Sequence, residues 1–173
     1  MLGLVGLLGL LAVACSVEET MPISDCRSGG SAFIVAQSVS TAELIPCFDP
    51  LPDGWEVDTV QINQDGTVMK LDSDRAGLGS AQLHFTEICD PGEAVPVPSE
   101  QEGAEAFEFV EQLTPGFRAE RYYLFPGGCV RWEFDFATGV SATHSVELQE
   151  RLTLFTRQFL NASMAENFIA EEL

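Results

Sequence analysis

Basic side chains are scarce in this sequence. Its 173 residues include eight Lys and Arg against 27 Asp and Glu, which gives a formal net charge of −19 at pH 7. A surface with this charge repels phosphate backbones and anionic lipid headgroups. We therefore expect no nucleic-acid partner, and any attachment to a membrane must come from something other than a basic patch.

Residues that bind metals or act as general bases near neutral pH are also few. The sequence has two histidines, His84 and His144, and none of its five cysteines forms a C-x-x-C pair. Zinc sites need several such ligands at close spacing, and no Ser lies in a G-x-S-x-G elbow. The sequence therefore predicts no metal site, no cofactor and no catalytic residue. We expect His84 on a strand and His144 in the first turn of a helix.

No apolar run is long enough to cross a membrane. A spanning helix needs about 20 apolar residues, whereas the run at the start of the chain ends near Ala14 and turns polar. An apolar segment of about 7–15 residues before a small-residue cleavage site is typical of a secretory signal peptide. The sequence "AVA" at 12–14 supplies such a site. We interpret residues 1–14 as a signal peptide, which predicts export.

A cysteine follows this cleavage site directly. The stretch "LAVAC" at 11–15 resembles the lipobox of bacterial lipoproteins, although the lipobox more often has Leu where Ala12 stands and usually follows a basic segment. The resemblance implies that Cys15 carries a diacylglyceryl group, with acyl chains such as palmitate, and becomes the mature N-terminus. The protein would then be a lipoprotein anchored to the cell membrane on its extracytoplasmic face. The alternative is ordinary secretion with a free Cys15.

The number of cysteines favours lipidation. Exported domains usually pair their cysteines, and four remain once Cys15 is modified, enough for two disulfides. Four cysteines allow three pairings, and the sequence does not formally choose between them. We favour Cys89 with Cys129, because the end of one strand lies beside the start of its antiparallel neighbour, at a separation that suits a disulfide. Cys26 then pairs with Cys47.

The rest of the chain divides into a tether and one folded part. Residues 15–30 lack periodicity and are interpreted as a flexible tether, and residues 31–173 as a single extracytoplasmic α+β domain. Ser40 and Glu43 have the spacing of a capping box. They predict a short N-terminal helical segment that Pro46 ends.

Residues 55–137 alternate between apolar and polar side chains, as strands with one buried face do. On the last strand Trp132, Phe134 and Phe136 share one face, which leaves Arg131, Glu133 and Asp135 on the other. The pattern predicts an antiparallel sheet with one solvated face. The expected strands are 55–63, 67–72, 81–88, 106–113, 117–125 and 129–137, with a surface loop at 92–104. The turn residues at 64–66 and 126–128 predict that the first two and the last two of these strands form hairpins.

The C-terminal third has the period of a helix instead. Leu148, Leu152, Phe155 and Phe159 fall at positions i, i+4, i+7 and i+11, which makes a single apolar stripe. We expect this stripe to pack against the aromatic face of the sheet. The predicted fold class is therefore α+β, with one antiparallel sheet packed against a C-terminal amphipathic helix and short N-terminal helical segments.

A resemblance extends over residues 36–136. The strings "LDSDRAG" and "FPGGCV", together with "AQSVSTAELIPC", "LPDGW" and "CDPGEAVPVPSE", look like those of uncharacterised actinobacterial cell-envelope proteins. The resemblance implies an exported, membrane-tethered protein. It implies no reaction, substrate or catalytic residue.

The carboxylates that could form a site have simpler explanations. Asp72 and Asp74 begin like a calcium loop, but Ala76 and Leu83 stand where a polar ligand and a Glu are required. Glu133 and Asp135 share one strand face, as glycosidase carboxylates can, but so do charged residues on any half-exposed strand. We therefore expect a non-enzymatic protein that binds an envelope partner or ligand. A small secreted hydrolase acting on a cell-wall or extracellular substrate is the alternative.

Overall fold

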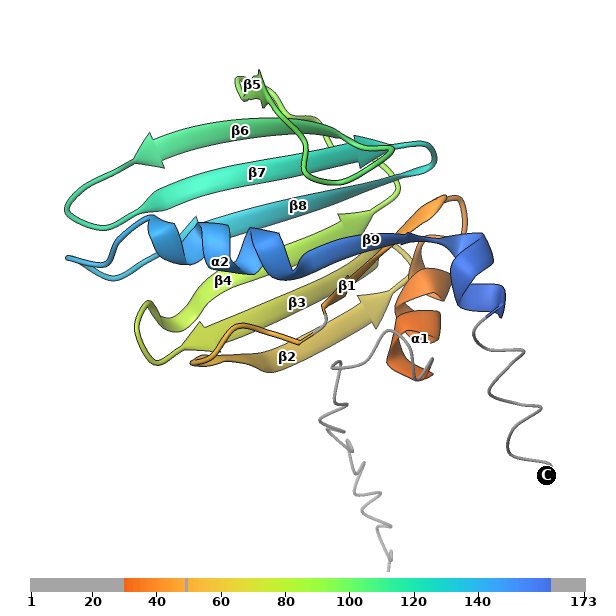
Figure 1. Ribbon diagram of the computed structural model, residues 1–173, viewed down its shortest axis with the longest axis horizontal. Helices are drawn as coiled ribbons and strands as arrows, with labels where there is room; N and C mark the ends of the chain where they lie inside the picture. Colours follow the sequence, from red (N-terminus) through yellow and green to blue (C-terminus); the bar gives the residue numbers. More distant parts are fainter. Residues whose placement is uncertain (1–29, 49, 163–173) are drawn as a thin grey trace, which may run out of the picture.

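The structure is a computed structural model that describes residues 30–48 and 50–162, and it is mostly β (Figure 1). Its body is a seven-stranded antiparallel sheet with the strand order β2-β3-β4-β8-β7-β6-β5. The strands are β2 (Trp55–Asn63), β3 (Gly66–Ser73), β4 (Gly77–Thr86), β5 (Val95–Val97), β6 (Glu105–Gln112), β7 (Arg118–Phe125) and β8 (Gly128–Asp135). The strands predicted from alternation are confirmed, and β5 lies in the segment predicted to be a loop.

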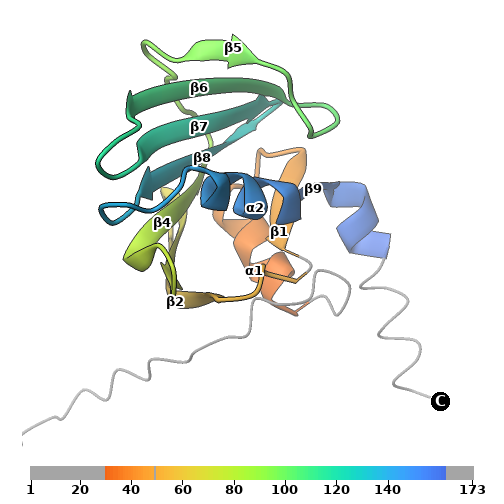
Figure 2. The ribbon, with the colours of Figure 1, turned by 60° about the vertical axis from the view of Figure 1, so that its left-hand side comes forward.

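A second layer covers one face of this sheet (Figures 1 and 2). The layer consists of α1 (Gly30–Ser38), α2 (Thr143–Arg151) and a small sheet in which β1 (Leu44–Phe48) pairs with β9 (Leu152–Thr156). The core lies between the layers. Trp132 of β8 is fully buried there, with its ring 5.7 Å from that of Phe48. The aromatic face predicted for β8 is thus the covered one.

The predicted C-terminal amphipathic helix is wrong, and with it the predicted fold class. The apolar stripe divides over three elements: Leu148 lies on α2, Leu152 and Phe155 on β9, and Phe159 in a helical segment at 157–162. The segment "LTLFT" is rich in residues that favour strands, and β1 gives it a backbone partner, with Ile45 opposite Phe155. Periodicity cannot anticipate a partner that lies about a hundred residues away in the sequence.

The predicted helical turn at 40–46 is also wrong. The helix comes earlier, as α1, and residue 30 of the predicted tether is its first residue. Residues 44–48 are instead the strand β1, all five of whose side chains are buried. The Arg157 guanidinium supports this arrangement, because it donates hydrogen bonds to three carbonyl oxygens at the end of α1 and just after it. These are Ala36 O, Val39 O and Ala42 O, at 2.8–3.0 Å.

The disulfide between Cys89 and Cys129 is confirmed. Thr86 at the end of β4 lies opposite Cys129 at the start of β8, so the two strands are the antiparallel neighbours that the prediction required. The Cα atoms of the two cysteines are 5.8 Å apart. The second pairing involves Cys26, which lies outside the described residues, and it stays a prediction.

The expectations for the start of the chain concern residues that the structure does not describe. These are the signal peptide at 1–14, the lipid on Cys15 and the tether up to residue 29. Within 30–48 and 50–162, no helix has the length and apolar character needed to span a membrane.

Candidate functional site

The second face of the large sheet carries the charged side chains. Among the described residues, no helix or strand lies over this face, since both helices and the small sheet pack on the other side (Figure 2). The register of the strands places Gln82, Glu133, Glu120 and Phe109 in one row across β4, β8, β7 and β6. Alternation along each strand therefore puts their side chains on the same, outward face.

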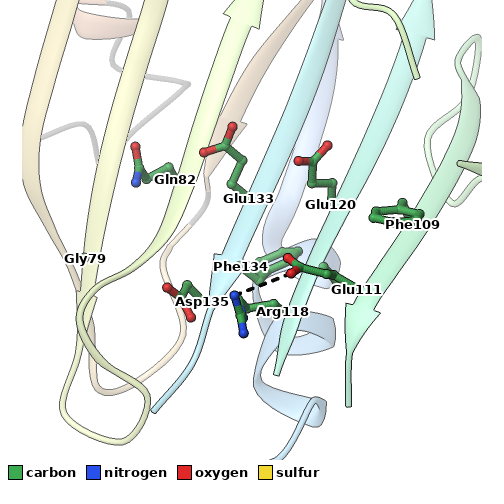
Figure 3. A pocket seen from close by; sticks show the side chains of 10 residues that line it. Gly79, Gln82, Phe109, Glu111, Arg118, Glu120, Glu133, Phe134 and Asp135 are labelled. Atoms are coloured by element: carbon green, nitrogen blue, oxygen red, sulfur yellow. Dashed lines mark ion pairs between the residues drawn. The ribbon is translucent and has the colours of Figure 1, made fainter. Parts of the chain in front are cut away.

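A shallow depression of about 310 Å³ lies on this face (Figure 3). Gly79 of β4 forms part of its wall, with φ of +60° and, beyond its own chain neighbours, no heavy atom within 4 Å of the place where a Cβ would stand. The rest of the lining is mostly charged. We call these side chains the acidic face: Gln82, Phe109, Glu111, Arg118, Glu120, Glu133 and Asp135.

Two carboxylates of the acidic face oppose each other directly. Glu120 on β7 and Glu133 on β8 are register partners, and side chains in such positions have Cβ atoms about 4.5–5.5 Å apart. Each carboxylate has its own donor. Glu133 accepts a 2.5 Å contact from Arg131 Nη2, and Glu120 accepts a hydrogen bond from the Tyr122 hydroxyl. These donors offset part of the repulsion between the two carboxylates. Both carboxylates remain accessible to a binding partner.

Arg118 is the cation within the depression. Its Nη1 lies 3.5 Å from Glu111 Oε1, and its Nη2 donates a 2.8 Å hydrogen bond to Gln112 Oε1. Asp135 is its register partner on β8. One guanidinium therefore stands among four carboxylates, so the depression keeps an excess of negative charge.

His84 lies on the same face, beside the depression. His84 is the register partner of Arg131 on β8, and its Nε2 is 3.4 Å from Glu133 Oε2. Burial disfavours the imidazolium and lowers the pKa of His84 below its usual value; Arg131 acts in the same direction, and Glu133 opposes it. The prediction that His84 is a strand residue is confirmed.

Tyr122, also on β7, supplies the hydrogen-bond donor to Glu120. Burial of its hydroxyl and the hydrogen bond to Glu120 raise the pKa of Tyr122 to about 12. The phenol is therefore protonated at neutral pH and acts as a donor. It fixes the position of the Glu120 carboxylate.

The other residues considered from the sequence lie elsewhere. His144 is in the first turn of α2, as predicted, with Nδ1 3.3 Å from Glu147 Oε1. Asp74 Oδ1 lies 3.6 Å from Arg75 Nε in the turn between β3 and β4. Asp72 accepts a 2.6 Å hydrogen bond from the backbone N–H of Gly79, so its carboxylate holds the turn between β3 and β4. Within the part of the chain that the structure describes, no three His, Cys, Asp or Glu side chains converge as metal ligands would.

A second polar cluster lies on the covered side of the sheet. Arg121 Nη2 is 2.5 Å from Glu100 Oε2, and its Nε donates a 2.9 Å hydrogen bond to the Tyr123 hydroxyl, which in turn donates to Glu100. Burial acts against the charge of Arg121, but Tyr123 and Glu100 together raise its pKa. The cluster holds the loop before β6 against β7. We assign it a structural role.

Sequence reasoning placed Glu133 and Asp135 on a solvated face but missed Glu111, Arg118 and Glu120. The signal for Arg118 and Glu120 was the alternation of charged residues in "FRAERYYLF", which puts both side chains on one face of the strand. The turn at 126–128 indicates that β7 lies beside β8, as it does, but alternation does not say which residues of the two strands face each other.

Comparison with known proteins yields no relative: no family model matches the chain, and no curated protein or solved structure does so.

Proposed function

We propose that the chain is an exported, lipid-anchored protein whose sheet binds a basic partner of the cell envelope through the acidic face. The observation that carries the proposal is the opposed pair Glu120 and Glu133, two of the four carboxylates that line the depression on the solvated side of the sheet. A cationic group placed between the pair would remove the repulsion of two like charges. The repulsion between these two carboxylates in the free protein therefore favours the binding of a cation.

The charge of the whole chain supports a basic partner. A net charge of −19 attracts cationic molecules from a distance and speeds their encounter with the surface. The depression is shallow and lined mostly by charged groups, whereas pockets for small organic ligands are concave and mostly apolar. Its form suits one or two Lys or Arg side chains of a larger molecule.

The same geometry favours binding over the hydrolase alternative. A general acid in glycoside hydrolysis needs a carboxyl whose pKa is raised by burial away from water. The Glu133 side chain is 34% exposed and pairs with Arg131 at 2.5 Å, so it does not stand in the dry, apolar surroundings that such a carboxyl has. Asp135 is exposed at the end of β8.

The lipid anchor rests on the sequence at the start of the chain, "LAVAC". The acidic surface would be repelled by anionic headgroups, so attachment to the membrane requires the acyl chains on Cys15. A Cys15→Ser variant should leave the detergent phase in a two-phase partition and accumulate uncleaved or be shed. An unmodified N-terminus on the mature wild-type protein, measured by intact mass, would show that the anchor does not exist.

Binding is tested with decalysine as a basic probe. We expect wild-type protein to bind it at low ionic strength, more weakly as salt rises, and the Glu120→Gln/Glu133→Gln variant to bind at least about tenfold more weakly. The matched control is Glu43→Gln/Glu150→Gln, which makes the same change of charge in the covering layer, where both side chains are exposed. Equal losses in both double variants would show that net charge, and not the acidic face, is responsible.

A further inference from the structure

Two tryptophan side chains are buried between the layers without a hydrogen-bond partner. Trp55, at the start of β2, is 6% exposed, and Trp132 of β8 is fully buried. Among the described residues, no acceptor lies within hydrogen-bond distance of either indole Nε1. Most buried donors in folded proteins are paired, because an unpaired one costs free energy. A ligand that brought an acceptor to one of these N–H groups would remove that cost.

The rings around the two tryptophans form a continuous apolar surface. Neighbouring ring centroids in it lie 5.4–6.3 Å apart. We call this surface the aromatic floor, and it consists of Trp55, Phe117, Trp132, Phe134 and Phe136. The aromatic floor thus combines apolar area with two unpaired donors.

The helix α2 lies over the sheet beside β8 and buries little apolar surface there (Figures 1 and 2). Leu148 is its only buried apolar side chain, and it belongs to the same hydrophobic core as the aromatic floor. The other buried side chains of the helix, Ser145 and Gln149, are polar. A helix of nine residues is marginal by itself, so α2 depends on this packing.

The remaining contacts that fasten α2 are weak. Glu147 Oε2 lies 2.8 Å from Arg75 Nη2, but the two side chains are 36% and 41% exposed, and exposed ion pairs contribute little to stability. At the start of the helix, Ala142 provides no side-chain cap, where Ser, Thr, Asp or Asn would stabilise it. Moving α2 away from the sheet therefore breaks few interactions besides the packing of Leu148.

Two hollows lead from the surface toward the aromatic floor. The first, of about 490 Å³, opens between α2 and the segment 50–54, with the apolar run 50–52 on one wall. The second, of about 390 Å³, shares Gly54 and Asp74 with the first and reaches Trp55. We call the two hollows together the mouth. The mouth connects solvent with the edge of the aromatic floor.

We propose that the aromatic floor binds the acyl chain of an uncharged ester, which enters through the mouth and takes the place of Leu148 as α2 moves outward. The ester carbonyl stays near the mouth and accepts a hydrogen bond from Trp55 Nε1. An acyl chain buries more apolar area than one leucine side chain, so its burial offsets the exposure of Leu148. This site lies on the covered side of the sheet and is separate from the acidic face.

The charges of the mouth select the head of the ligand. Five charged side chains line the first hollow, and three of them are acidic: Asp53, Asp74, Glu147, Arg75 and Arg151. The second hollow adds Glu56 and Asp72. This excess of carboxylates disfavours a fatty-acid carboxylate, as does the net charge of −19. A cationic head has no acceptor for the indole N–H, whereas an ester has a carbonyl and no charge.

The test compares three amphiphiles with the same ten-carbon chain, each below its micellar concentration: monodecanoylglycerol, the ether 1-decylglycerol and decanoate. The ether lacks the carbonyl, and decanoate carries a charge. Calorimetric titration should give an affinity for monodecanoylglycerol about tenfold above the other two. In NMR spectra the indole proton of Trp55 should move downfield with the ester only, whereas that of Trp132 should respond alike to ester and ether. A Trp55→Phe variant assigns the two signals.

A second measurement tests the movement of α2. Glu147→Gln removes the ion pair with Arg75, so the association rate of monodecanoylglycerol, followed by tryptophan fluorescence, should rise about twofold. The matched control is Glu150→Gln, the same change of charge at an exposed residue of α2 that lines neither hollow. Its rate should equal that of wild type.

Three results would overturn the inference. The first is no binding of monodecanoylglycerol below its micellar concentration. The second is equal affinity for ester and ether with the same response of the Trp55 signal, because the unpaired donor would then have no part in binding. The third is an equal association rate in Glu147→Gln and Glu150→Gln, because α2 would then not control entry. None of these results bears on the acidic face, which lies on the other side of the sheet.

Discussion

Glu120 and Glu133 face each other across β7 and β8 on the solvated side of the sheet. Neutralising one of them removes a repulsion, and a Gln at position 120 can still accept the hydrogen bond from Tyr122. We expect Glu120→Gln to raise the free energy of unfolding by about 0.2–1 kcal/mol at low salt. The gain should shrink as salt screens the charges. Chemical denaturation measures the change in unfolding free energy. The control is Glu105→Gln, because Glu105 lies opposite the uncharged Leu124. A loss of stability in Glu120→Gln would mean that Glu120 and Glu133 do not repel each other.

The titration of His84 reports the charges around it. Because Arg131 lowers the pKa of His84 and Glu133 raises it, Arg131→Gln should move the pKa up and Glu133→Gln should move it further down. NMR of the imidazole protons measures both shifts, and His84→Gln assigns the signals. Shifts in the same direction in the two variants would contradict the described arrangement.

The lowered pKa also sets a dependence of stability on pH. The unfolded chain takes up a proton at His84 near pH 6.5, whereas the folded chain takes it up at lower pH. Stability from the neutral imidazole is therefore present above pH 6.5 and is lost as pH falls through the folded pKa. In His84→Gln, the decline of the unfolding free energy below pH 6.5 should be shallower than in wild type.

The hydrolase alternative is tested by replacing the carboxylates that the sequence singled out. Glu133→Gln/Asp135→Asn should change the free energy of unfolding by no more than about 1 kcal/mol, because exposed ion pairs contribute little. Release of reducing ends from cell-wall glycan should be the same for both proteins. An activity that is present in wild type and lost in the folded double variant would establish the hydrolase instead.

The disulfides give a further prediction. Removing the Cys89–Cys129 bridge, which spans a sequence separation of 40, should lower the free energy of unfolding by about 2–4 kcal/mol in Cys89→Ala/Cys129→Ala. Peptide mapping without reductant should also recover a Cys26–Cys47 peptide. A peptide that joins Cys47 to Cys89 or to Cys129 in quantity would contradict both pairings.

The strands could be predicted because each carries its own signal. Alternation in "CVRWEFDFA" indicates a strand and also tells which side chains are buried, and Trp132, Phe134 and Phe136 are buried. The pairing of Cys89 with Cys129 could be predicted because one cysteine follows a strand and the other begins a strand that was expected to be its antiparallel neighbour. The hairpins at 64–66 and 126–128 are confirmed too, because turn residues mark which strands they join. The remaining neighbours could not be predicted, since alternation is a property of one strand at a time.

The covering layer and the site escaped prediction for one reason. Leu152 and Phe155 fit a helical stripe, yet both lie on β9, whose partner β1 is far away in the sequence. Glu120 likewise becomes important only opposite Glu133. Both features depend on which residues of two strands face each other, and alternation along one strand does not record this.

The pairing of β1 with β9 has a consequence for the order in which the protein folds. Leu44 and Thr156 are register partners, so a growing chain holds β1 without its strand partner until nearly all of the described residues have been synthesised. The apolar face of the large sheet stays incompletely shielded over that interval. Contacts so distant in sequence slow folding, and incompletely covered chains are prone to aggregate. Nascent chains that stop before β9 should therefore depend on chaperones until the last strand arrives.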